Sequence, residues 1–106
     1  MTDKRIVFVT VPDQAVGEKI AHALIDERLA SCANLIPGLV SIYQWEGRRH
    51  REPEVLMVIK TRVDRFESLK ERVLQLHPYQ CPEIVSVPIE MGFHRYLQWI
   101  DGEIGP

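Results

Sequence analysis

Apolar residues are arranged along the chain in short runs that alternate between strand-like and helix-like spacing. Residues 4–11 form a continuous apolar run, which predicts a strand buried on both faces. Pro12 ends this run, and Asp13 is a suitable N-cap for a helix that continues to about residue 29. Apolar side chains recur in this helix at the spacing of one face: Val16, Ile20, Ala21, Leu24, Ile25 and Leu29. We therefore expect the helix to lie on the sheet.

A long β-hairpin is predicted over residues 31–61. Both arms are rich in β-branched and aromatic residues, and the polar segment Glu46–Pro53 separates them as the tip. Pro37 and Gly38 interrupt the first arm and predict a bulge or a break there. Arg62 closes the second arm. Apolar residues occur on both faces of both arms, so we expect neither face to be open to water.

The rest of the chain predicts a helix, a strand and a second helix. Asp64 and Glu67 have the spacing of a capping box in front of a helix that ends near His77. Residues 84–89 predict a fourth strand, which its proline ends early or places at a sheet edge. A last helix is predicted over residues 93–100, followed by a frayed tail.

The predicted order is β-α-β-β-α-β-α in one domain that covers residues 1–106. Two β-α-β crossovers joined by a central hairpin define an α+β fold, the ferredoxin-like split βαβ sandwich. Both main helices then cover one face of a four-stranded antiparallel sheet. The other face would expose more apolar surface than a soluble monomer tolerates. We therefore expect the chain to oligomerise through the sheet and the hairpin.

Charge and composition argue against several classes of partner. The net charge is −2, with acidic and basic residues interspersed, whereas nucleic-acid binding usually requires a clustered basic face. No segment is apolar over a length that spans a bilayer, so no membrane partner is expected. No signal peptide precedes the first strand, which predicts a cytoplasmic protein with reduced thiols.

Cysteine and histidine are the candidate metal ligands, but their spacing matches no closed zinc pattern. The favoured interpretation is that Cys32 and Cys81 are small buried hydrophobic residues rather than ligands of a metal site within one chain. A metal site assembled between subunits is the alternative. Cys32 with His77 has the residue types of a nucleophile and base, but a strand is an unfavourable place for a nucleophile. Dinucleotide, P-loop and serine-elbow motifs are absent from the sequence, so we expect no enzyme.

Lys60 and four aromatic residues are candidates for a ligand cleft. Lys60 follows five apolar residues, so it needs a carboxylate or a ligand as a partner. Three carboxylates are available for this: Glu54, Glu83 and Glu90. The alternative is a lysine that reaches water from a strand end. The aromatic residues form either a stacking cleft or part of the core: Tyr43, Trp45, Tyr96 and Trp99. The core is the favoured interpretation, because most large aromatic side chains are buried there.

Five blocks resemble the CutA, or divalent-ion tolerance, family in the family's order. They are R-L-A-S-C-A-N at 28–34, S-I-Y-Q-W-E-G at 41–47, E-V-L-M-V-I-K-T at 54–61, H-P-Y-Q-C-P-E at 77–83 and Y-L-Q-W-I at 96–100. Together they cover nearly the whole chain. The chain departs from the family pattern at Cys81, where an aliphatic residue is more common, and at the basic segment 48–51.

The resemblance implies a cytosolic homotrimer of ferredoxin-like subunits, similar in assembly to PII signalling proteins. It also implies a role in tolerance of copper and other divalent cations, without an established enzymatic reaction. Matching positions in the family's inter-subunit cleft are Asn34, Tyr43, Trp45, Glu54, Lys60, Tyr79, Glu83, Tyr96 and Trp99. The places to look for a metal such as copper are Cys32, His77 and Cys81, since thiolate and imidazole suit copper. The alternative function is a PII-like sensor of a small anionic ligand, with Lys60 as its counter-charge.

Overall fold

Four strands and three α-helices follow one another in the predicted order. The computed structural model describes residues 2–106. It contains β1 (Lys4–Val11), α1 (Gln14–Asp26), β2 (Cys32–Trp45), β3 (Arg48–Arg62), the 3-10 turn η1 (Val63–Arg65), α2 (Phe66–Leu76), β4 (Ile84–Pro88) and α3 (His94–Ile104). The strands form one antiparallel sheet in the order β2-β3-β1-β4. The α+β, split βαβ prediction is therefore confirmed, and β4 lies at an edge as its proline indicated.

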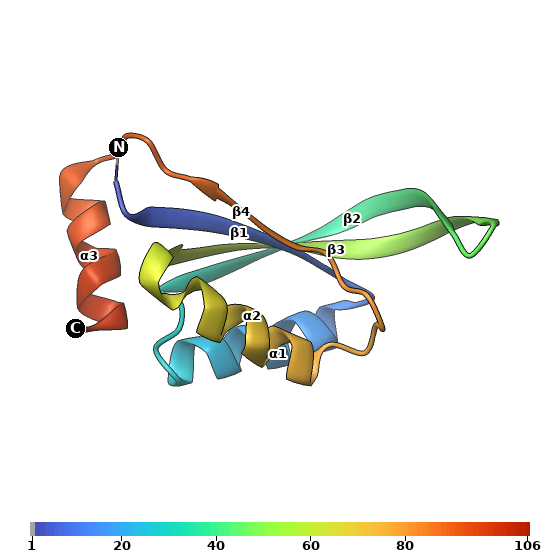
Figure 1. The fold of residues 1–106 in the computed structure, drawn as a ribbon, viewed down its shortest axis with the longest axis horizontal. Helices are drawn as coiled ribbons and strands as arrows, with labels where there is room; N and C mark the ends of the chain where they lie inside the picture. The colour runs from blue at the N-terminus through green and yellow to red at the C-terminus, as the bar shows by residue number, and fades with distance from the viewer. Residues whose placement is uncertain (1) are drawn as a thin grey trace.

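Helices α1 and α2 lie on the same face of the sheet, and α3 stands across one end of it (Figure 1). Alternate residues of the two central strands form the sheet side of the core: Val7, Val9, Val11, Val55, Met57 and Ile59. The helices contribute Ile20, Leu24, Leu69 and Val73, all fully buried. The alternate apolar side chains of the strands and the apolar faces of the helices thus pack together in a single core.

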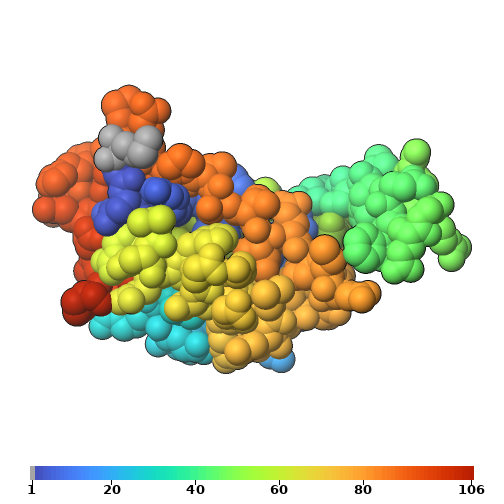
Figure 2. Space-filling view, viewed as in Figure 1, coloured from blue at the N-terminus to red at the C-terminus, as the bar shows by residue number. Residues whose placement is uncertain are grey.

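The opposite face of the sheet has no helix over it. Val85 and Val87 of β4 are 50% and 41% exposed, and Ile36 of β2 is 48% exposed. The prediction that both faces of the hairpin would be covered is therefore not met within one chain. The outer part of the hairpin also projects beyond the helices as a separate lobe (Figures 1 and 2).

The hairpin has a much shorter tip than the sequence predicted. Only Glu46 and Gly47 form the turn, with φ of 51° and 77°, as a two-residue turn with positive φ at both positions requires. Residues 48–53 pair with β2 instead of forming a loop. The hydrogen bonds between the strands are made by the backbone, so polar side chains are compatible with a strand pair whose two faces are exposed to water. The predicted bulge is confirmed between Ile36 and Leu39, where Gly38 has a φ of 90°.

The start of α1 agrees with the sequence, but its end does not. The Asp13 carboxylate accepts a hydrogen bond from the Val16 amide at 2.9 Å, which confirms the predicted cap. The helix ends at Asp26, earlier than the predicted residue 29, because Arg28 adopts a left-handed φ of 58°. The Leu29 amide then donates to the Leu24 carbonyl at 2.9 Å, so Leu29 still packs against the core after the helix has ended.

The predicted capping box of α2 is wrong. Arg65 is the residue that precedes the helix, and it makes no side-chain cap. The Asp64 carboxylate instead accepts two hydrogen bonds from the Arg62 guanidinium, at 2.9 and 3.2 Å. A charged partner two residues away therefore outcompetes the backbone amides for this carboxylate.

Helix α3 is longer than predicted, and the tail expected to fray is anchored. Ile104 is only 2% exposed, and Ile100 is fully buried. Arg28 donates to the backbone carbonyls of Gly102 and Glu103 at 2.9 and 3.0 Å. Residues 101–104 were expected to belong to the frayed tail, but burial of Ile100 and Ile104 keeps this segment helical.

Candidate functional site

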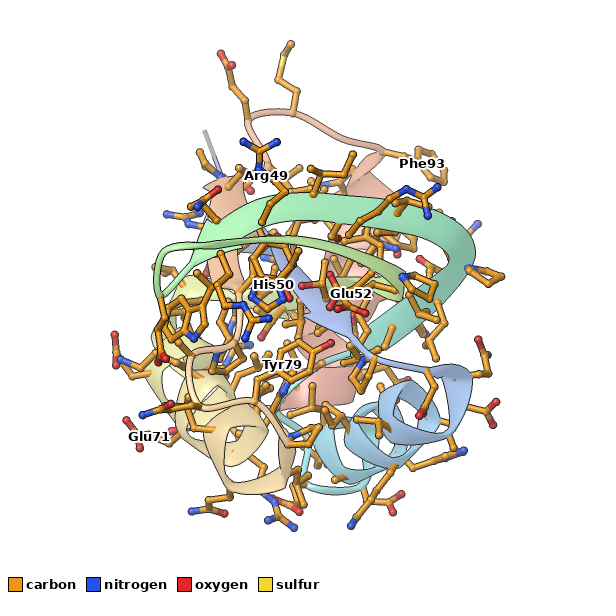
Figure 3. The ribbon with its side chains drawn as sticks, turned by 90° about the vertical axis from the view of Figure 1, so that its right-hand side faces the viewer. Arg49, His50, Glu52, Glu71, Tyr79 and Phe93 are labelled. Atoms are coloured by element: carbon orange, nitrogen blue, oxygen red, sulfur yellow. The ribbon has the colours of Figure 1, made fainter. Side chains whose placement is uncertain are left out.

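A pocket of about 510 Å³ opens where the hairpin leaves the body of the sheet. Its walls come from four parts of the chain: Thr10 of β1, Ser41–Tyr43 and Trp45 of β2, Glu54 of β3, and Tyr79–Cys81 with Glu83 from the α2–β4 loop. A volume of this size is typical of a site for a small molecule. In the view along the hairpin, Tyr79 lies next to the face of the hairpin that carries His50 and Glu52 (Figure 3). Glu71 points away from them into solvent.

A buried carboxylate and a phenol pair at the base of this pocket. Glu54 is only 6% exposed, and its Oε2 accepts a hydrogen bond from the Tyr79 hydroxyl at 2.7 Å. Burial, this bond and the charge of Glu54 all raise the pKa of Tyr79, so the phenol stays protonated. Tyr79 therefore acts as a fixed hydrogen-bond donor.

His77 holds the loop that carries Tyr79. It is 7% exposed, and its Nε2 lies 2.8 Å from the Thr10 carbonyl oxygen. The Tyr79 amide donates to His77 Nδ1 at 3.1 Å. A carbonyl only accepts, so the proton must be on Nε2, and the ring is neutral with both nitrogens in use. A metal could bind His77 only by displacing one of these bonds.

A second cluster lies around the start of β2. The Lys60 ammonium donates to the Asn34 side-chain oxygen, and the Cys32 thiol lies 3.9 Å from the same oxygen. The partner of Lys60 is therefore an amide and not one of the three carboxylates considered from the sequence. Burial and the nearby Cys32 raise the pKa of Tyr96, which stacks on Trp99 with ring centroids 5.6 Å apart.

The two clusters lie at opposite ends of the sheet. Glu54 and Lys60 are six residues apart on β3, which is about 20 Å at ~3.3 Å per residue. The predicted cleft residues therefore separate within one chain: Tyr43, Trp45, Glu54, Tyr79 and Glu83 line the pocket, and Asn34, Lys60, Tyr96 and Trp99 belong to the second cluster.

The three predicted metal ligands separate in the same way. Cys32, half-buried on β2, is remote from His77 and from Cys81, which is exposed in the pocket wall. Among residues 2–106 no group of three or more potential ligand side chains comes together.

The four aromatic candidates are not core residues in this chain. Their exposed fractions lie between 39% and 43%, so the interpretation that favoured the core is not supported. Four residues that line the pocket were not predicted: Thr10, Ser41, Ile42 and Gln80. They are of common types, and no motif or spacing in the sequence marks them.

The fold and the site together define a class of protein: a ferredoxin-like α+β domain with an extended central hairpin and an acidic, aromatic pocket at its base. The sequence profile described as "CutA1 divalent ion tolerance protein" matches residues 5–103. The chain therefore belongs to the CutA divalent ion tolerance family.

Individual relatives agree with this assignment. The chain is 47% identical over 102 residues to the divalent-cation tolerance protein CutA of Thermus thermophilus, covering 96% of this chain and 99% of that protein. It is 42% identical over 95 residues to a chloroplastic CutA of Arabidopsis thaliana, covering 90% of this chain but only 52% of that protein. The crystal structure of CutA from Xylella fastidiosa superposes with a TM-score of 0.96 at 38% identity, covering 98% of this chain and all of that one.

The comparisons do not extend to the cellular compartment. One relative is named as chloroplastic, and the chain spans about half of its length. Within the described part of the chain, no helix is both long and apolar enough to cross a membrane. The cytoplasmic location stays a prediction.

Proposed function

We propose that this chain is the subunit of a cytoplasmic homotrimer that takes part in the response to divalent metal ions. The observation that supports this most directly is the separation of the candidate ligands. Cys32 and Cys81 lie at opposite ends of one sheet, so their thiols meet only if different chains contribute them. Family membership supplies the link to divalent-cation tolerance, and no catalytic role is assigned.

The edges and the open face of the sheet favour the assembly. β2 and β4 are both edge strands, and their outer backbone groups pair with no other strand of residues 2–106. Apolar side chains are exposed on both of them: Ile36, Val40 and Ile42 on β2, and Val85 and Val87 on β4. Two different edges on one subunit suit a head-to-tail contact, which closes as a ring when its rotation permits. A trimer of PII-like arrangement satisfies this requirement.

Copper, as Cu(I), is a metal that the available donors suit. Thiolates are soft ligands, and the two cysteines are free. Both ring nitrogens of His77 are engaged, so we assign His77 to holding the loop that carries Cys81, and the thiols to the metal.

Titration of the assembled protein with Cu(I) and Cu(II) tests this proposal. Cys32→Ser and Cys81→Ser should each lower the affinity at least about tenfold, equivalent to ~1.4 kcal/mol. His77→Ala is expected to weaken binding less than either. Equal affinity in the wild type and in both serine variants would remove the site assignment.

The PII-like sensor of an anionic ligand is not favoured. The relatives are named for tolerance of cations. Lys60, its proposed counter-charge, contacts Asn34 at the far end of the sheet from the pocket. The pocket itself carries two carboxylates and no lysine or arginine in its walls.

A further inference from the structure

One histidine nitrogen of the projecting hairpin has no partner among the described residues. His50 lies on β3, directly across the ladder from Tyr43, and 31% of its side chain is exposed. Its Nε2 atom is buried all the same, and it is the one buried side-chain nitrogen or oxygen of residues 2–106 that makes no hydrogen bond. Buried polar atoms are almost always paired. Nε2 therefore requires a partner that residues 2–106 do not supply.

The rest of the imidazole ring is held in place. The Tyr43 ring stacks on it, with centroids 5.1 Å apart and planes 10° from parallel. Glu52 lies beside it on the same strand, with Oε1 3.9 Å from His50 Nδ1 (Figure 3). This distance is too long for a hydrogen bond, but the carboxylate charge favours the tautomer with its proton on Nδ1. The lone pair of Nε2 is then free to accept.

These features are those of a histidine that binds a metal ion. Neutral imidazole is the commonest metal ligand among side chains, and it binds through a ring nitrogen that carries no proton. A ligating histidine usually has a carboxylate or a carbonyl beside its other nitrogen, which orients the ring. His50 has Glu52 in that place, whereas both nitrogens of His77 are engaged.

Most of the positive charge around His50 is directed away from it. Side chains alternate between the two faces of a strand, so Arg49 and Arg51 lie on the opposite face from His50. Arg48 shares the face of His50 but is exposed, so water and salt screen its charge. The neighbour on the other side along this face is Glu52, which is negative. The hairpin therefore does not exclude a cation at this nitrogen.

We propose that His50 Nε2 is a ligand of the bound metal ion and that Glu52 orients the ring. This inference rests on the proposed metal response and names a nitrogen ligand for the same site. The other ligands are the two thiols assigned above. Cys81 lies in the wall of the pocket that Tyr43 also lines, and Cys32 comes from another chain. Among residues 2–106 no three such ligands come together, so the site needs two chains.

Zinc titration of the intact, assembled protein tests the proposal. Zn²⁺ accepts imidazole and thiolate ligands and does not oxidise the thiols. His50→Gln should lower the zinc affinity at least about tenfold, because even the group behind a ligating histidine is worth about 10–100-fold. Competition with a chromophoric chelator measures the change. The matched control is His22→Gln, which replaces an exposed histidine of α1 and should leave the affinity unchanged.

Nitrogen NMR of the imidazole rings identifies the ligand atom. The resonance of His50 Nε2 should shift when stoichiometric Zn²⁺ is added to the wild type, whereas those of both His77 nitrogens should stay in place. Glu52→Gln should also weaken zinc binding, but by a smaller factor than His50→Gln, since it removes an orienting charge and not a ligand.

Light scattering and thermal unfolding of each variant show whether the assembly is intact. A lower mass or melting temperature of His50→Gln together with unchanged zinc affinity would mean that another chain pairs with Nε2, and would overturn the proposal. A His50 Nε2 resonance that zinc leaves in place would overturn it too. If His50→Gln does not assemble, this wild-type resonance decides alone.

The serine variants separate this inference from the metal proposal on which it rests. If Cys32→Ser and Cys81→Ser lose zinc affinity and His50→Gln does not, the thiol site stands and the nitrogen ligand is wrong. Unchanged affinity in all three variants would remove both.

Discussion

At the scale of single residues, a short chain of hydrogen bonds connects the sheet to the pocket. The Thr10 carbonyl accepts from His77, His77 accepts from the Tyr79 amide, and the Tyr79 hydroxyl donates to Glu54. Each bond fixes the next group. The loop after α2 is therefore positioned by His77 and Glu54, which are both largely buried. The orientation of Glu54 therefore depends on Tyr79.

Tyr79→Phe should destabilise the protein by about 1–3 kcal/mol, because it leaves a buried carboxylate without its donor. Urea unfolding at fixed protein concentration measures the change. Tyr96→Phe is the matched control, since the Tyr96 hydroxyl makes no hydrogen bond with the described residues. A loss of stability as large in the control as in Tyr79→Phe would contradict the assigned role.

The sequence named several residues that line the pocket, but not the partners of their side chains. Glu54 and Tyr79 were both candidates, yet nothing in the sequence indicated that they pair, because the path of the α2–β4 loop decides it. Lys60 was expected to need a carboxylate, and it found the Asn34 amide across the β2–β3 ladder instead. Asp64 had the position of a helix cap, but Arg62 binds it. Local pattern predicts residue type and burial, whereas long-range packing selects the partner.

At the scale of elements, the space around two glycines differs between helix α1, which packs closely on the sheet, and helix α3. A Cβ on Gly17 of α1 would lie 2.7 Å from Leu35 Cδ2 and 3.2 Å from Val11 Cγ2, so α1 approaches the sheet through this glycine. A Cβ on Gly102 of α3 would meet nothing within 4 Å. The same substitution should therefore have opposite effects at the two positions.

Gly102→Ala should raise the free energy of unfolding by about 0.5–1 kcal/mol, since alanine is the better helix residue. Gly17→Ala should be less stable than Gly102→Ala by about 1–3 kcal/mol, because overpacking against Leu35 outweighs the gain in helix propensity. Thermal unfolding of both variants at one protein concentration checks the order. The reverse order would contradict the close approach of α1.

Helix α3 is held to the sheet by charge as well as by its two isoleucines. Asp101 accepts from Lys4 and Arg62, each at 3.1 Å, and both basic residues are more than nine-tenths buried. Partial burial favours the neutral carboxyl, but the hydrogen bonds from Lys4 and Arg62 outweigh it and lower the pKa of Asp101. The charged form is therefore the one that holds α3.

Acid should release α3 for this reason. A carboxyl whose pKa is lowered by folding stabilises the fold above its unfolded pKa of about 3.9, and that contribution is lost as the pH falls through the lower folded value. Amide hydrogen exchange in α3, expressed as a protection factor relative to the intrinsic exchange rate at each pH, should therefore become less protected below about pH 4. Asp101→Asn should make this exchange faster at neutral pH and less dependent on acid, while the exposed Asp26→Asn should change neither. An acid response that Asp101→Asn leaves intact would assign the effect to another carboxyl.

The elements themselves were largely predictable, and their ends were not. Strand β1 and the start of α1 have the predicted bounds because buried periodicity and a cap define them. The tip of the hairpin was predicted to be too long, because the charged residues 48–53 have the composition of a loop although they pair with β2. The length of α3 depends on its docking against Arg28 and the end of the sheet, which a local pattern does not contain.

At the scale of the whole molecule, a single chain exposes surfaces that are usually covered in a stable protein. In the described residues 2–106, one sheet face is open, two strand edges are unpaired and the hairpin projects beyond the helices. The candidate ligands are also divided between the two ends of the sheet. A head-to-tail ring of three chains would cover the face, pair the edges and bring the two ends of neighbouring chains together.

The most direct test of this account is the mass of the intact protein in solution. Multi-angle light scattering at micromolar concentration should give about three times the 12.3 kDa of one chain. Val87→Glu, which places a charge on the exposed face of β4, should shift the mass toward one chain. A wild-type mass of one chain at that concentration would contradict the central claim that the open face is an interface between copies.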